Sequence, residues 1–122
     1  QLLAIMIRLN GIEPDDVASA LFTVTTDLDA EFPALAARRL GWMNVPLICS
    51  YEINVPDSLP RCIRILVNWN TDREQKEIVH AYVNDAKQLR PDLCQLPPVD
   101  KEELEGWISE YIESHETGND SD

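Results

Sequence analysis

Residues 61–69, Arg-Cys-Ile-Arg-Ile-Leu-Val-Asn-Trp, alternate with the two-residue period of a β-strand, and their one internal charge limits the possible folds. Alternation separates Arg64 from the three β-branched side chains of the stretch. A lone charge in an apolar strand costs several kcal/mol unless it is paired or faces a polar cavity. Arg64 is therefore paired with Glu52 of the preceding apolar segment, exposed at a sheet edge, or part of a pocket. In a pocket, a fixed guanidinium would recognise a carboxylate or stabilise developing negative charge.

Two more segments have the composition of strands. Residues 17–25 are rich in Val, Phe and Thr, and residues 46–53 form a second apolar run. Between them, Pro33 suits the first turn of a short helix over 34–40, which Gly41 stops. The order of these elements predicts an α+β fold in which a mixed β-sheet carries helices packed on one face.

The chain opens directly in a helical pattern. Apolar residues recur at helical spacing over residues 2–9, and Asn10-Gly11 is a good helix stop. This helix has neither an N-cap nor a preceding turn. We therefore expect that residues upstream of Gln1 have been lost.

The second half of the chain predicts two longer helices. Thr71-Asp72-Arg73-Glu74 has the form of a capping box and predicts a helix to about residue 87. A last helix is predicted over about 100–113, with Asp100 as its cap, and its apolar stripe should pack on the body of the protein. From about residue 114 the chain is polar and expected to be disordered. The stripe consists of Leu104, Trp107, Ile108, Tyr111 and Ile112.

Length and charge restrict the function. A chain of 122 residues has room for one domain. With 22 Asp and Glu against 10 Lys and Arg, its net charge is -12, which argues against binding to nucleic acid or to an anionic membrane. Residues 94–122 hold nine acidic residues and one basic residue, so most of the acidity belongs to this extension. We accordingly divide the chain into a domain over 1–93 and a C-terminal extension over 94–122.

Several chemistries are disfavoured because their motifs are missing. Cys49, Cys62 and Cys94 are widely spaced and lie near neither histidine, which indicates reduced thiols in a cytoplasmic protein rather than a zinc site or a disulfide framework. No apolar run approaches the ~20 residues of a membrane-spanning helix. The sequence contains no dinucleotide fingerprint, phosphate-binding loop, nucleophile elbow or zinc-protease motif.

Taken together, these segments resemble the AroH-class chorismate mutases, a monofunctional trimeric family, over about residues 1–93. No single motif is diagnostic, but all occur in one order, and the intervals from Glu52 to Arg64 and from Arg64 to Tyr82 are those of the family. The motifs are Thr25-Thr26-Asp27-Leu28-Asp29-Ala30, Phe32-Pro33-Ala34, Arg38 with Gly41-Trp42-x-x-Val45-Pro46, Cys49-x-x-Glu52, Arg61-Cys62-Ile63-Arg64, Tyr82 and Leu89-Arg90-Pro91-Asp92-Leu93.

The resemblance implies a pseudo-barrel homotrimer that converts chorismate to prephenate, on the route to Phe and Tyr, without cofactor, metal or covalent intermediate. Arg64 would face the ether oxygen whose charge grows as the C–O bond breaks, and Glu52 would accept the ring hydroxyl. The pocket would lie between subunits, with the stretch 32–38 supplied by the neighbour. The remaining contacts implied by the family are Phe32, Ala34, Arg38, Cys49, Tyr82, Leu89 and Arg90.

Two departures from the family pattern affect these expectations. The family begins with a strand carrying Arg-Gly-Ala-Thr-Thr-like residues, one arginine of which binds substrate, whereas this chain starts in the helix that follows. We expect that strand and its cationic contact to be absent, leaving the chain weakly active or inactive. In addition, Cys49 and Glu52 fall on opposite faces of an unbroken strand, so both reach one pocket only if the strand bulges or ends between them.

Two other functions remain open at this point. The first is a non-catalytic module that binds or senses a small ligand. The second is another trimeric architecture, that of the reactive-intermediate imine deaminases, which also uses an arginine for a carboxylate at a subunit interface. Binding without turnover would identify the first, and ammonia release from an imine would identify the second.

Overall fold

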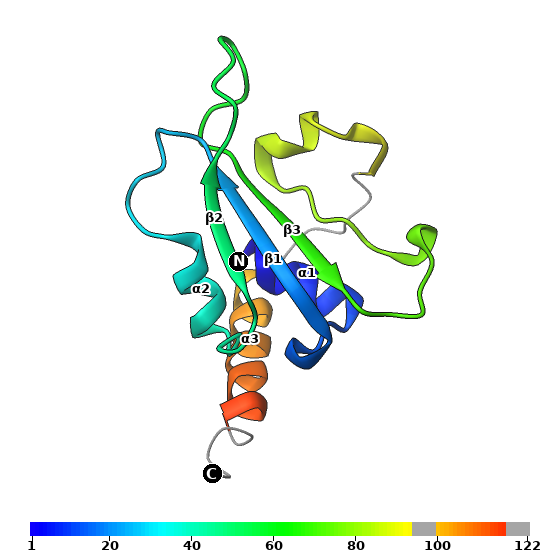
Figure 1. Ribbon diagram of the computed structural model, residues 1–122. Coiled ribbons are helices and arrows are strands. Elements are labelled where there is room, and N and C mark those ends of the chain that lie inside the picture. The colour runs from blue at the N-terminus through cyan, green and yellow to red at the C-terminus, as the bar shows by residue number, and fades with distance from the viewer. Residues whose placement is uncertain (94–99, 117–122) are drawn as a thin grey trace.

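The computed structural model describes residues 1–93 and 100–116, which form a small sheet flanked by helices (Figure 1). The strands and helices predicted from the sequence are confirmed within three residues at each end, except for the helix proposed over 71–87. The elements are α1 (Leu2–Asn10), β1 (Val17–Val24), α2 (Pro33–Arg39), β2 (Leu47–Tyr51), β3 (Ile63–Trp69) and α3 (Lys101–Glu116), with short 3₁₀ turns at Pro14–Asp16, Gln75–Glu77, Asn84–Gln88 and Pro91–Leu93.

The sheet is mixed, as predicted. Its order is β2-β1-β3, with β2 parallel to β1 and β3 antiparallel to it. Successive residues of a strand point to opposite faces, so neighbouring rows of the register belong to opposite faces of the sheet. The row on one face is Cys49, Phe22 and Ile65, and the adjacent row on the other face is Ile48, Leu21 and Leu66.

The helices build one hydrophobic core on the face of Phe22, so the predicted packing on one face is confirmed (Figure 1). Burying these branched and aromatic side chains is the main stabilising contribution. The other face is uncovered, with 65% of Ile48 and 59% of Leu66 exposed. The buried side chains that the helices contribute include Leu3 and Ile7 of α1, Ala37 of α2, and Leu104 and Tyr111 of α3.

The predicted cap and packing of α3 are confirmed. Asp100 Oδ1 accepts the backbone N–H groups of Glu102 (3.0 Å) and Glu103 (3.3 Å), which would otherwise lack partners at the start of the helix. On the apolar stripe, Tyr111 is buried and its hydroxyl accepts a hydrogen bond from Nε1 of the buried Trp42 (3.1 Å). The stripe thus docks α3 onto the body of the protein.

The end of α3 corrects one expectation. The helix continues through residues 114–116, where the sequence predicted disorder. The reason is that His115 contacts both Glu13 Oε2 (2.7 Å) and the carbonyl oxygen of Tyr111 (2.8 Å). Gly41 lies beside this contact at φ +102°, and a Cβ there would approach His115 Cβ to 3.4 Å. The acidic tail over 117–122 and Cys94 lie outside the described residues.

The helix predicted over 71–87 is wrong. Thr71 Oγ1 accepts the N–H of Arg73 (3.2 Å), so it makes a local turn instead of a helix cap. Residues 78–83 lie outside any helix or strand, and the backbone of Ile78 and of Val83 is extended. The buried amide of Asn10 takes both backbone groups of Val79, accepting its N–H (2.8 Å) and donating to its carbonyl (2.9 Å). A tertiary partner therefore replaces the helical hydrogen bonds in a segment whose β-branched residues favour extended backbone.

Candidate active site

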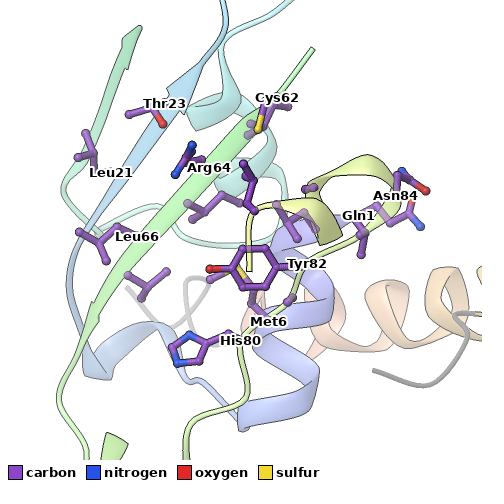
Figure 2. Close-up of a pocket in the computed structure, with 18 of the residues that line it drawn as sticks. Gln1, Met6, Leu21, Thr23, Cys62, Arg64, Leu66, His80, Tyr82 and Asn84 are labelled. Atoms are coloured by element: carbon purple, nitrogen blue, oxygen red, sulfur yellow. The ribbon is translucent and has the colours of Figure 1, made fainter. Parts of the chain in front are cut away.

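A cavity of about 1070 Å³ opens beside β3, bounded by α1 and by the segment 78–86. Its size is at the upper end of typical small-molecule sites, roughly 300–1000 Å³. Figure 2 shows Arg64 on β3, and Tyr82 and His80 on the neighbouring segment close to α1. The predicted site residues that line this cavity are Glu52, Arg64, Tyr82 and Leu89.

Arg64 and Glu52 form an ion pair, with Nε 2.9 Å from Oε1. The Arg64 side chain is 58% exposed and that of Glu52 only 21%, so the carboxylate is held back while the guanidinium stays open to the cavity. Arg64 is thus paired, and in the described part of the chain it also lies on an edge strand of the sheet. Its side chain lines the cavity as well, where its function stays a prediction.

Glu52 reaches Arg64 because β2 ends first. The strand stops at Tyr51, and the Glu52 N–H still donates to the carbonyl of Val24 (2.8 Å), which anchors this residue to β1. Cys49 lies earlier on β2, opposite Phe22, and packs against the hydrophobic core. In this single chain, Cys49 and Glu52 are therefore not brought together in one pocket.

Of the predicted contacts Tyr82, Leu89 and Arg90, the first two lie on the wall of the cavity. Tyr82 and Leu89 line the cavity, whereas Arg90 is engaged by Asp92 through two contacts, Nε to Oδ1 (3.1 Å) and Nη2 to Oδ2 (2.9 Å). This hydrogen-bonded pairing raises the pKa of Arg90 and lowers the pKa of Asp92. Tyr82 lies close enough to Arg90 to act on it electrostatically.

The predicted contacts on α2 are not among the residues that line this cavity. Phe32, at the start of α2, is 74% exposed, whereas Ala34 is buried against the body of the protein. Arg38 sits in the last turn of the same helix. Within one chain, the structure therefore does not bring Phe32, Ala34 or Arg38 to Arg64.

Sequence reasoning missed several polar residues that line the cavity, among them Thr23, His80 and Asn84. Thr23 lies on β1 directly opposite Arg64, and its Oγ1 donates to Glu52 Oε1 (2.5 Å). Apolar Ala20 and Phe22 suit the core face of the strand, so alternation could have placed Thr23 on the opposite face, which also carries Arg64. His80 was assigned to a helix that does not form, so no pattern placed it here.

A polar clamp fixes the entry to β3. Thr25 Oγ1 accepts the N–H of Cys62 (2.9 Å) and donates to Asp27 Oδ1 (2.5 Å). The Asp27 carboxylate also accepts the N–H of Arg61 (3.1 and 3.2 Å), and Arg61 has the left-handed φ of 49°. The hydrogen bond from Thr25, followed by that from Arg61, lowers the pKa of Asp27. The clamp holds the backbone three residues before Arg64, in a conformation that most residues avoid.

Metal ligands do not gather in residues 1–93 and 100–116, where no group of three or more His, Cys, Asp or Glu side chains could hold an ion. The thiols of Cys49 and Cys62 are free. In the same described part of the chain, no helix has both the length and the apolar character needed to cross a bilayer.

Comparisons with known proteins agree on one family. The family model of type I chorismate mutases matches residues 1–93. The chain is 49% identical over 94 residues to chorismate mutase AroH of Thermus thermophilus, covering 76% of this chain and 77% of that protein. It is 44% identical over 94 residues to chorismate mutase AroH of Bacillus subtilis, covering 76% and 74%. A solved chorismate mutase from Clostridium thermocellum shares the fold with a TM-score of 0.69 and 53% identity, over 71% of this chain and 78% of the other. This chain belongs to the type I chorismate mutase family.

Proposed function

We propose that this chain catalyses the Claisen rearrangement of chorismate to prephenate. Family membership and the Arg64–Glu52 pair at the edge of the cavity support this function, and the pair is the observation that carries it. In the rearrangement one ether C–O bond breaks and one C–C bond forms within a single molecule. The reaction therefore requires no nucleophile, no external electron source and no net proton transfer.

Two physical effects are available to such an enzyme. A shaped pocket holds the substrate in its reactive conformer, which removes part of the entropic barrier. A fixed cation aimed at the ether oxygen stabilises the negative charge that grows there as the C–O bond breaks. In our proposal Arg64 is that cation, Glu52 accepts a hydrogen bond from the ring hydroxyl, and Tyr82 contacts a substrate carboxylate. Leu89 supplies apolar wall, with Arg90 close by.

We further propose that the active enzyme is a homotrimer whose pockets lie between subunits. The uncovered sheet face supports this arrangement, because apolar side chains such as Ile48 and Leu66 are rarely left exposed together without a partner. The exposure of Phe32 supports a role for the stretch 32–38, with Ala34 and Arg38, in a neighbour's pocket, while the Cys49 region stays with Glu52 of its own chain. The free thiols of Cys49 and Cys62 are consistent with a reducing, cytoplasmic location.

The comparisons do not favour the alternatives, a ligand-binding module and an imine deaminase. The decisive experiment follows loss of chorismate and appearance of prephenate with the purified chain and, beside it, with a form extended upstream of Gln1. The variants are made in a form that is active. We expect Arg64→Ala to lower kcat/KM by roughly 100- to 1000-fold, about 3–4 kcal/mol in the barrier. We expect Arg64→Lys to recover only part of this loss, because a point charge cannot reproduce the planar guanidinium.

Arg73→Ala is the matched control. Arg73 is another exposed arginine near β3, with its guanidinium 5.4 Å from the Trp69 ring centroid, and it does not line the cavity. Near-full turnover of Arg64→Ala would show that the Arg64 assignment is wrong. If the chain and the form extended upstream of Gln1 both fold, assemble and bind chorismate without converting it, the ligand-module function replaces the enzyme.

A further inference from the structure

We infer that Thr23 is a positioning residue of the active site, acting through Glu52 on Arg64. This inference rests on the proposed function, since it assigns a role within that catalytic site. Thr23 lies on the central strand β1, in register with Ser50 of β2 and Arg64 of β3. Thr23 lines the cavity, but in this proposal its effect on the reaction passes through the Glu52 carboxylate.

Thr23 and Arg64 converge on the same oxygen atom. Thr23 Oγ1 is 2.5 Å from Glu52 Oε1, and Arg64 Nε is 2.9 Å from that atom. An ionised carboxylate only accepts hydrogen bonds, so the threonine hydroxyl must be the donor. Oε1 is thus occupied from two sides, which fixes the orientation of the carboxylate.

The consequence is that the remaining polar atoms are left for a ligand. Among residues 1–93 and 100–116, Glu52 Oε2 and the terminal Nη1 and Nη2 of Arg64 make no hydrogen bond. One acceptor and a pair of donor nitrogens therefore stay available at the cavity. The shared contact at Oε1 fixes the directions of these atoms. Thr23, on the central strand β1, holds that contact in place.

Thr23 is suited to this task by its place in the fold. The Glu52 backbone is already tied to β1 through its N–H bond to Val24, so the hydroxyl adds a second attachment one residue away on the same strand. Threonine is also restricted at χ1, so it holds its donor in a fixed direction. A carboxylate fixed at backbone and side chain costs little further entropy when substrate binds.

The test compares Thr23→Val, which keeps the branched shape, with Thr23→Ser, which keeps the hydroxyl. We expect Thr23→Val to lower kcat about 10-fold with a smaller change in KM, as for loss of a hydrogen bond to a charged group. Thr23→Ser should stay within about twofold of wild type, because the donor remains. Ser19→Ala is the matched control, since Ser19 is another hydroxyl of β1, bonded to Asn68 away from the ion pair.

Two further measurements isolate the route of the effect. In a Glu52→Ala background, Thr23→Val should add no further loss, because the group it orients is gone. By NMR, the ¹³C signal of the Glu52 carboxyl carbon should be the same in wild type and Thr23→Ser and should shift in Thr23→Val, whether or not the chain turns over chorismate, because only Thr23→Val removes the hydrogen bond to Oε1. An unchanged kcat in Thr23→Val, an equal loss in Thr23→Ser, or an unchanged Glu52 carboxyl signal in Thr23→Val would each overturn the inference. Absence of turnover in wild type with the NMR pattern intact would overturn only the proposed function.

Discussion

At the scale of single residues, the Asn10 side chain supplies the two backbone hydrogen bonds that Val79 would otherwise make with a neighbouring strand. Its side chain is 3% exposed and bonds both backbone groups of Val79, while also donating to the carbonyl of Met6 (2.9 Å). Removing the amide would break three hydrogen bonds made by this buried residue, each worth roughly 1 kcal/mol. Asn10 therefore holds the segment that carries His80 and Tyr82 against α1.

We predict that Asn10→Ala lowers the free energy of unfolding by about 2–3 kcal/mol, measured by urea denaturation. Hydrogen exchange should rise first at the amide of Val79, because that N–H loses its acceptor. Asn70→Ala is the control, since the Asn70 side chain is exposed, and it should change stability by no more than about 0.5 kcal/mol. Equal effects of the two variants would show that the amide of Asn10 contributes no special stability.

The same residues show what sequence alone could predict. Charge in apolar strand segments singled out both Arg64 and Glu52, and both lie at the cavity. The hydrogen bonds of Asn10 to Val79 span 69 residues, so no local pattern encodes them. Thr23 was missed for a related reason: alternation assigns it to a face of the strand, but only the register shows that it lies opposite Arg64.

At the scale of secondary-structure elements, His115 fastens the end of α3. One ring nitrogen faces the carbonyl oxygen of Tyr111 and the other faces the Glu13 carboxylate, and both of these groups are acceptors. Satisfying both contacts requires a doubly protonated ring. Partial burial lowers the pKa of His115, but the hydrogen bonds to Tyr111 and Glu13 and the charge of Asp15 outweigh it, so the net shift is upward.

A raised pKa in the folded state gives a definite pH dependence. The stabilisation is complete below the unfolded pKa of about 6.5 and is lost as the pH rises through the folded value. We predict that the melting temperature of wild type falls more between pH 6 and pH 8.5 than that of His115→Gln. The excess should be about 2–5 °C, as for roughly 0.5–1 kcal/mol from a cation at a helix C-terminus.

His80→Gln is the control for this prediction, because His80 is exposed and has no described partner in residues 1–93 and 100–116. Its melting temperature should follow wild type across the same pH range. If His115→Gln follows wild type as well, then protonation of His115 does not fasten α3.

The elements also show where sequence prediction fails. The helices that were predicted correctly have local signals, such as Asp100 at the start of α3 and Gly11 at the end of α1, which adopts the left-handed φ of 69°. The false helix after residue 71 also had a local signal, its apparent capping box. It fails because β-branched Ile78, Val79 and Val83 disfavour a helix, and because Asn10 provides the alternative partner.

At the scale of the whole molecule, the two faces of the sheet differ. One face is covered by the helices, and the other presents the row Ile48, Leu21 and Leu66, followed by the row Ser50, Thr23 and Arg64. The apolar row thus lies directly beside the row that holds the proposed catalytic arginine. A partner that covered the first row would also close over the second, so assembly and activity should be coupled.

We predict that Ile48→Asp abolishes assembly and most of the mutase activity while leaving the subunit folded. Ile48 is 65% exposed and does not line the cavity, so a carboxylate there is harmless in a single chain but costs several kcal/mol when an interface removes its water. Sedimentation should give three times the 13.9 kDa chain mass for wild type and the single mass for the variant. Met43→Asp is the matched control, because Met43 is similarly exposed, at 59%, but lies outside the sheet, and it should remain trimeric and active. If Ile48→Asp remained trimeric, this face would not be part of the interface. If the variant were monomeric with full activity, the entire active site would lie within one chain.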